Sequence, residues 1–169
     1  MRFVVTGEWN KNRLLRLILG FFLVYAALFW VTNFILYFDK MGLTADSVTR
    51  YYLGDEAAFT QPRSLRGMAE ISHFHLFAMG VLVLTLTHLV LFVPIALGLR
   101  TLLVILTFSA ALADELAGWG VRFVDPTFAY VKIAAFIAMQ ASLALLLVVI
   151  IFGVARPARN GYEDAAPSE

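Results

Sequence analysis

The sequence predicts an all-α membrane protein, a four-transmembrane-helix bundle with a long outer loop that contains a short interfacial helix. Composition supports this class, because hydrophobic residues make up 61% of the 169 residues and charged residues only 15%, with a mean hydropathy of +0.81. Four apolar segments are each long enough to cross about 30 Å of hydrocarbon, which takes about 20 helical residues. Each crossing must be a helix, because lipid cannot satisfy free backbone N–H and C=O groups.

The expected spans of this single membrane domain, 1–169, cover residues 14–37, 70–95, 101–119 and 128–154. The first is too long for the core of a signal peptide and no small-residue cleavage site follows it, so we expect it to be retained. The segments "ALGLR" and "VRFVDPT" are short links, so the spans that they join run antiparallel. Residues 155–169 are expected to form a flexible tail.

The long outer loop, residues 38–69, contains the segment "TADSVTRYYLG". Thr44 is a helix N-cap residue and Gly54 a helix stop, so a short helix is expected between them. Tyr51 and Tyr52 suit the lipid headgroup region, where the ring contacts lipid and the hydroxyl contacts water. This helix either caps the bundle or forms a docking surface for a periplasmic partner.

Basic residues at both chain ends and in the second link fall on one side of the membrane, namely Lys11, Arg13, Arg16, Arg100, Arg156 and Arg159. The positive-inside rule makes that side cytoplasmic. We therefore expect a multi-pass protein of the bacterial inner (cytoplasmic) membrane with both termini in the cytoplasm. The opposite side also carries basic residues, which are Lys40, Arg50, Arg63, Arg66, Arg122 and Lys132.

Several classes of function find no support in the sequence. The formal net charge is +1, and no basic stripe with interleaved aromatic residues is present, so nucleic acid is not an expected partner. The absence of cysteine excludes disulfides, thiolate metal sites and a cysteine nucleophile. The sequence has no phosphate-binding loop and no Ser-His-Asp arrangement, so we expect no catalytic activity from this chain alone.

All three histidines lie on the second expected span, within residues 67–88. At about 100° per residue, Glu70, His73, Gly80 and His88 share one helix face, whereas His75 lies on the opposite face. His73 and His75 therefore cannot hold the same metal ion within one helix. His88 lies three to four turns inside the span, where an unpaired imidazole lacks water. His73 and His88 are separated by about 22 Å along the helix axis, a spacing that fits two stacked haems.

This segment resembles the membrane helices of b-type cytochromes, in which two histidines about 14 residues apart each ligate a haem. The resemblance implies that His73 and His88 bind haem b, with His75 as a further candidate for cofactor binding. No other span has a histidine, so the opposite ligand would come from a second copy across a two-fold axis or from Met139 on the fourth span. The segment "HFHLFAMG" also resembles a family of small bacterial four-span membrane proteins, a likeness that implies no activity.

A second constellation begins with "EISH", which places Glu70 and His73 at i and i+3, as in di-iron helical bundles. The third span is antiparallel to the second, so Asp114 and Glu115 reach the same outer level. These four residues are candidate ligands for an iron, copper or zinc ion. In the alternative interpretation, Asp114 and Glu115 end the helix in water or pair with Arg63, Arg66 or Arg122.

Two classes of function remain open at this point. The first is a small integral-membrane redox subunit that binds haem b or another metal through histidines of the second span, within a larger electron-transfer complex. The alternative is a non-catalytic structural or assembly subunit of a membrane complex without a cofactor; a small metal carrier or sensor is a third option. The expected partners are the lipid bilayer and either a second copy in a homodimer or other membrane or periplasmic subunits.

Overall fold

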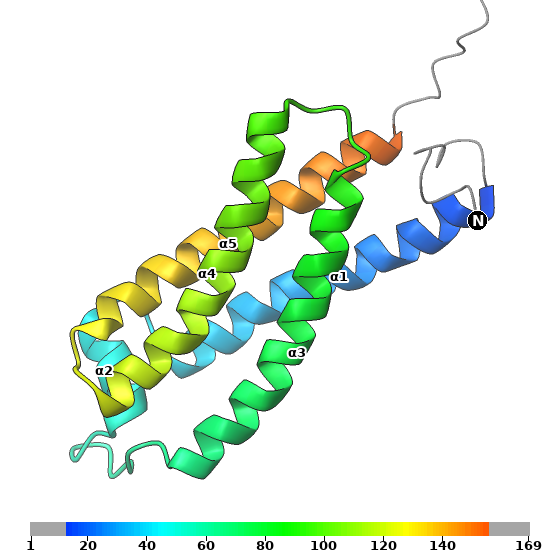
Figure 1. The fold of residues 1–169 in the computed structure, drawn as a ribbon. Coiled ribbons are helices and arrows are strands. Elements are labelled where there is room, and N and C mark those ends of the chain that lie inside the picture. Colours follow the sequence, from blue (N-terminus) through cyan, green and yellow to red (C-terminus); the bar gives the residue numbers. More distant parts are fainter. Residues whose placement is uncertain (1–12, 156–169) are drawn as a thin grey trace, which may run out of the picture.

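The computed structural model describes residues 13–155, which form five helices (Figure 1). These are α1 (Arg13–Lys40), α2 (Ala45–Leu53), α3 (Leu65–Val90), α4 (Leu97–Phe123) and α5 (Phe128–Ala155). Among them, α1, α3, α4 and α5 are long and apolar enough to cross a membrane. The predicted all-α bundle with four spans and a short helix in the outer loop is therefore confirmed.

The four long helices form a bundle whose two ends differ (Figure 1). One end, called the cap end below, carries α2 and the turn between α4 and α5. At the opposite end α1 begins, α5 ends and α3 turns into α4. Helices α4 and α5 pack against each other most extensively, α3 packs on both, and α1 packs mainly on α5. Helices α1 and α3 make little direct contact.

The short helix α2 has the limits that its sequence predicts. The Thr44 hydroxyl accepts a hydrogen bond from the Ser47 N–H, which caps the first turn. Gly54 ends the helix with φ of +84°, a conformation that glycine adopts without strain. Tyr52 is buried and Tyr51 half-buried, so the adjacent tyrosines cover the end of the bundle.

Gly118 on α4 allows this close covering. A Cβ atom at position 118 would lie 2.6 Å from the hydroxyl oxygen of Tyr52. Only a residue without a side chain lets the Tyr52 ring reach the α4 backbone, and α2 packs on both α4 and α5 as a result.

The link between α3 and α4 differs from the prediction. The predicted second span ends at residue 95 and the predicted link covers 96–100, but α3 ends at Val90 and α4 already begins at Leu97. Pro94 explains the difference, because it lacks an N–H and disfavours helical geometry in the preceding residue. Arg100 instead stabilises the link by donating to the Val93 carbonyl oxygen at 3.0 Å.

Other predicted limits change as well, including the end of α1, which lies at Lys40 instead of residue 37. Helix α3 begins at Leu65, five residues earlier than expected, because the Ser64 hydroxyl caps it by accepting from the Gly67 N–H. Helix α4 continues to Phe123 instead of ending at residue 119. The predicted tail begins at 155, but Ala155 is still helical, and residues 156–169 lie outside the described part of the chain. Lys11, Arg156 and Arg159, which contributed to the predicted orientation, also lie outside it.

Helix α1 is held to the bundle through the half that lies nearer the cap end. The Trp30 indole N–H donates to the backbone oxygen of Gln140 at 3.0 Å. The Tyr37 ring stacks on Phe136 with 3.7 Å between ring centroids, and Phe34 contacts the same ring edge-on at 5.8 Å. Earlier residues of α1 leave large apolar side chains exposed, including Leu17, Ile18, Phe21 and Val24. These side chains face the lipid of a membrane-spanning bundle.

Candidate polar site near the cap end

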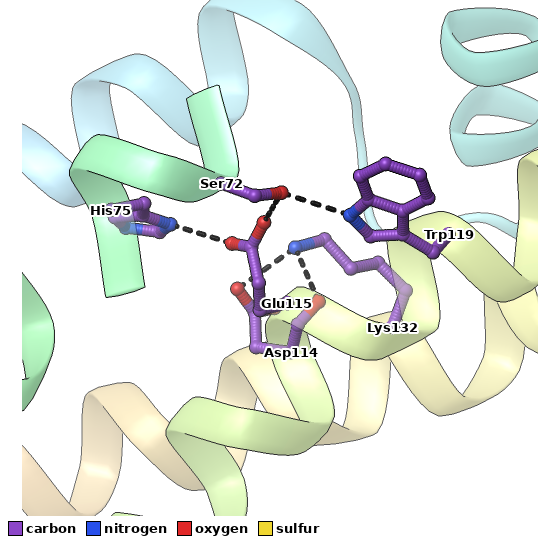
Figure 2. A network of polar contacts seen from close by, with 6 residues as sticks. All are labelled: Ser72, His75, Asp114, Glu115, Trp119 and Lys132. Atoms are coloured by element: carbon purple, nitrogen blue, oxygen red, sulfur yellow. Dashed lines mark hydrogen bonds and ion pairs between the residues drawn. The ribbon is translucent and has the colours of Figure 1, made fainter. Parts of the chain in front are cut away.

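A group of polar side chains lies inside the bundle near the cap end (Figure 2). This polar cluster consists of Ser72 and His75 from α3, Asp114, Glu115 and Trp119 from α4, and Lys132 from α5. Ionisable side chains in a membrane span are rare and face the bundle interior or each other, because lipid does not solvate them. The arrangement of this cluster follows that rule.

The spacing of the residues along each helix explains how they meet. Ser72 and His75 are three residues apart and therefore lie on one face of α3, directed at α4. Asp114 and Glu115 are adjacent on α4, so their side chains diverge by about 100° around the helix. Glu115 consequently points toward α3, while Asp114 points toward Lys132 on α5 (Figure 2).

Glu115 is the centre of one half of the cluster. Its carboxylate accepts hydrogen bonds from His75 Nδ1, at 2.8 Å, and from the Ser72 hydroxyl. The Trp119 indole N–H donates to the same Ser72 oxygen at 2.8 Å. Trp119, Ser72 and Glu115 thus form one chain of hydrogen bonds that fixes the direction of each polar atom. A proton on His75 makes its contact with Glu115 an ion pair.

Asp114 and Lys132 form the other half. The Lys132 ammonium lies 2.8 Å from Asp114 Oδ2 and donates to the Asp114 backbone oxygen at 3.0 Å. The two side chains are only 4% and 9% exposed. The second carboxylate oxygen, Asp114 Oδ1, is buried and has no hydrogen-bond partner among the described residues. One acceptor of this ion pair is therefore unused.

A cavity of about 460 Å³ adjoins the cluster. All five helices contribute polar residues to its wall, among them Asn33, Tyr52, His75, Asp114 and Lys132. The Asn33 amide nitrogen is also buried without a hydrogen-bond partner in the part of the chain that the structure describes. Burial, and after it the nearby Asp114 carboxylate, raise the pKa of the Tyr52 phenol, so this hydroxyl stays protonated.

Comparison with known proteins adds one match. The Aq_1264_TM family, described as a transmembrane helical domain, matches residues 42–161, which is more than half of the chain. The chain belongs to this family. The Aq_1264_TM match and the four long apolar helices together make it a multi-pass membrane protein with a lipid bilayer around it. No curated protein and no solved structure matches the chain.

The Aq_1264_TM match includes α2 to α5 and begins after α1. All six residues of the polar cluster lie within the matched residues. Asn33 and the other α1 residues that line the cavity lie before them. The family domain thus supplies the charged groups, and α1 completes the wall of the cavity.

The structure places the two predicted haem ligands on the outside of this Aq_1264_TM domain. The predicted shared face of α3 points away from the bundle, because all four of its residues are exposed. These are Glu70, His73, Gly80 and His88. His88 lies in the last turn of α3, so the prediction that it lies three to four turns inside the span is wrong. The reason is that α3 stops before Pro94.

Met139 does not fit the role of second axial ligand. It is buried in the core and lines the cavity, on the inner side of the bundle. His73 and His88 face outward from α3, so Met139 and these histidines point into different surroundings.

The predicted metal ligands Glu70, His73, Asp114 and Glu115 are not brought together. Glu70 is exposed and pairs with Arg66 at 2.8 Å, whereas the two acidic residues of α4 point inward. No three His, Asp or Glu side chains within residues 13–155 form a group that could hold a metal ion. The prediction that α3 and α4 bring Glu115 level with the start of the second span is confirmed. The face of α3 that meets α4 differs from the predicted one, because Ser72 and His75 point toward α4 in place of Glu70 and His73.

The alternative interpretation of Asp114 and Glu115 is also wrong. Neither residue ends the helix in water or pairs with an arginine, because their partners are Lys132 and His75. The three arginines make other contacts. Arg122 donates to the Arg63 backbone oxygen at 2.7 Å, Arg63 lies over the Tyr51 ring, and Arg66 pairs with Glu70.

Sequence reasoning missed Ser72, Trp119 and Lys132. Lys132 was counted with the residues of the outer surface, although it lies within the expected fourth span, 128–154. An ionisable residue inside a span is itself a signal of a functional site, and it could have been paired with the acidic residues of the preceding helix. Ser72 and Trp119 carry no comparable signal in the sequence.

Proposed function

We propose that the chain is a ligand-binding membrane subunit that holds an uncharged polar group in the cavity beside the polar cluster. One observation carries this proposal. The cavity wall contains a buried acceptor, Asp114 Oδ1, and a buried donor, Asn33 Nδ2, neither of which has a partner among the described residues. Leaving such an atom unpaired costs about 1–3 kcal/mol, which a suitable ligand would recover.

The charges of the cluster favour an uncharged group. Asp114 is balanced by Lys132, and Glu115 is balanced by His75 when the imidazole is protonated. An anion would meet two carboxylates, and a cation would meet the Lys132 ammonium. A hydroxyl group can donate to Asp114 while a second oxygen of the same molecule accepts from Asn33, so a compound with both satisfies the two unpaired atoms.

In this proposal the protein lies in the bacterial inner membrane with both termini in the cytoplasm and the cap end outside. Arg13, Arg16 and Arg100 support that orientation, because they lie at the end of the bundle opposite α2. The cavity is then in the outer half of the bilayer. The chain has no catalytic step of its own and works with other subunits.

4-Methoxyphenol tests the proposal, because it carries one hydroxyl donor and one ether oxygen on a small ring. We expect it to raise the melting temperature of the detergent-purified protein by several degrees, whereas 1,4-dimethoxybenzene, which lacks the donor, should not. An Asn33→Leu variant should reduce the shift that 4-methoxyphenol causes, because the ether oxygen of the compound loses its Asn33 donor. Equal responses to both compounds in the unaltered protein would show that no hydroxyl-specific site exists.

A second candidate function is the redox subunit with haem b bound by His73 and His88. The observation that favours it is the open outer face of α3, where both histidines are exposed and no described atom lies within 4 Å of a Cβ built on Gly80. Two copies related by a two-fold axis would place these faces together, with each histidine opposite its counterpart. The residues thus fit haem only between two chains.

The haem proposal predicts a sharp α-band in the reduced-minus-oxidised visible spectrum of the purified protein. His88→Ala should remove the part of the band that comes from the haem at the end of α3, while the helices stay folded. His75→Ala is the matched control, since His75 points inward and should leave the band unchanged. A band that survives loss of both His73 and His88, or a spectrum without any band, would exclude this candidate.

A further inference from the structure

The gap between α1 and α3 contains a second cavity, of about 470 Å³, nearer the middle of the bundle. Its wall comes from these two helices alone and is almost entirely apolar, with Phe22, Tyr25, Val81 and Leu82 as examples. Tyr25 and Val81 are exposed, so the cavity opens on the side of the bundle. In a membrane-spanning bundle that side faces lipid acyl chains.

The apolar cavity adjoins the polar one. Phe29 of α1 and Ala78 of α3 line both cavities, so the two spaces meet between these residues. The combined space is polar near the cap end and apolar toward the middle of the membrane. From His75 to Thr85 along α3 it extends over ten residues, which is about 15 Å of helix.

We infer that the ligand is a single-chain amphiphile that enters sideways from the bilayer, with its chain between α1 and α3 and its hydroxyl-bearing head in the polar cavity. This inference rests on the proposed function, to which it adds the class of ligand and the route of entry. The head is uncharged, because an anion would meet the Asp114 and Glu115 carboxylates and a cation would meet the Lys132 ammonium. Its hydroxyl donates to Asp114 Oδ1, which belongs to a residue only 3% exposed, and its second oxygen accepts from Asn33 Nδ2.

The loose packing of α1 provides the entry route. Because α1 contacts mainly α5 and makes little contact with α3, few helix–helix contacts have to separate before a chain can slide between α1 and α3. The wall of the polar cavity also includes the exposed side chains of Lys40 and Arg63 near the cap end, which mark the alternative route from water. The α1–α3 route suits an apolar chain, because its wall is almost entirely apolar.

Photolabelling tests the inference. The probe is a 4-decyloxyphenol with a diazirine in the middle of its chain, added to the protein in lipid nanodiscs. We expect labelled peptides from residues 22–32 and 78–85, and a loss of at least threefold in labelling when excess 4-decyloxyphenol competes. Labelling spread evenly over all lipid-facing surfaces, with no effect of the competitor, would overturn the inference.

A variant in the apolar cavity alone sharpens the test. Val81→Phe should fill the apolar cavity and reduce labelling of residues 22–32 and 78–85 at least threefold, while 4-methoxyphenol still raises the melting temperature, because Val81 does not line the polar cavity. Val148→Phe is the control, since Val148 is exposed on α5 and lines neither cavity. If 4-methoxyphenol has no effect on the unaltered protein, the proposed function itself fails; if it acts but the apolar cavity is not labelled, only the chain-binding inference fails.

Discussion

Replacing Lys132 by methionine should lower the free energy of unfolding by about 3–5 kcal/mol, because it leaves the Asp114 carboxylate buried without its cation. Methionine has nearly the length of lysine and no charge, so the change removes the ammonium and leaves the space filled. Both contacts of the ammonium, with Asp114 Oδ2 and with the Asp114 backbone oxygen, are lost together. Unfolding by added SDS, followed by circular dichroism in mixed micelles, measures the difference.

Two further variants show whether burial is the cause. Asp114→Asn combined with Lys132→Met should recover most of the lost stability, because no unpaired charge remains inside. Arg66→Met should change the stability by less than about 1 kcal/mol, since its ion pair with Glu70 is exposed and water screens it. Equal losses for Lys132→Met and Arg66→Met would mean that the Asp114–Lys132 pair is not buried in the folded protein.

The elements of this fold could be predicted because their signals are local. A run of apolar residues defines each span, and Thr44 and Gly54 define α2, whichever neighbours these segments later contact. The link between α3 and α4 was misplaced for a local reason as well. Pro94 was included in a helix although its missing N–H and its effect on the preceding residue end one.

The candidate site could be predicted only in part, because it depends on how each helix is rotated about its own axis. Helical spacing correctly separated His75 from His73 and His88. It could not decide which of these two faces of α3 meets α4, since both carry a histidine and apolar residues. The antiparallel arrangement of α3 and α4 predicts that Glu115 lies at the level of Glu70 and His73. Only the packing of the helices shows that its partners are Ser72 and His75.

The two faces of α3 therefore belong to two different hypotheses, a haem site and an internal ligand site. The outward face offers His73 and His88 to a second copy, and the inward face offers His75 to Glu115. A haem between two chains and a ligand inside one chain make use of different residues. Each can be tested without disturbing the other.

Phe136→Ala should detach α1 from the rest of the bundle and lower the free energy of unfolding by about 3 kcal/mol. Phe136 is buried on α5, stacks on Tyr37 and contacts Phe34 and Phe38, so one ring joins three aromatic residues of α1. Lipid tails are as apolar as the core, so the loss comes mainly from packing contacts that the cavity left by the ring no longer provides. SDS unfolding followed by circular dichroism measures it.

Phe152→Ala is the control for this change, since Phe152 is 66% exposed on the same helix and should alter stability little. A Tyr37→Leu variant should be destabilised less in the Phe136→Ala background than in the unaltered protein, because the stacked pair is already broken. Similar losses for Phe136→Ala and Phe152→Ala would mean that α1 is held by other contacts, such as the Trp30 hydrogen bond to Gln140. Since α1 forms one wall of both cavities, a detached α1 should also abolish the hydroxyl-specific effect of 4-methoxyphenol. Both the attachment of α1 and the binding of the ligand therefore depend on the Phe136 ring.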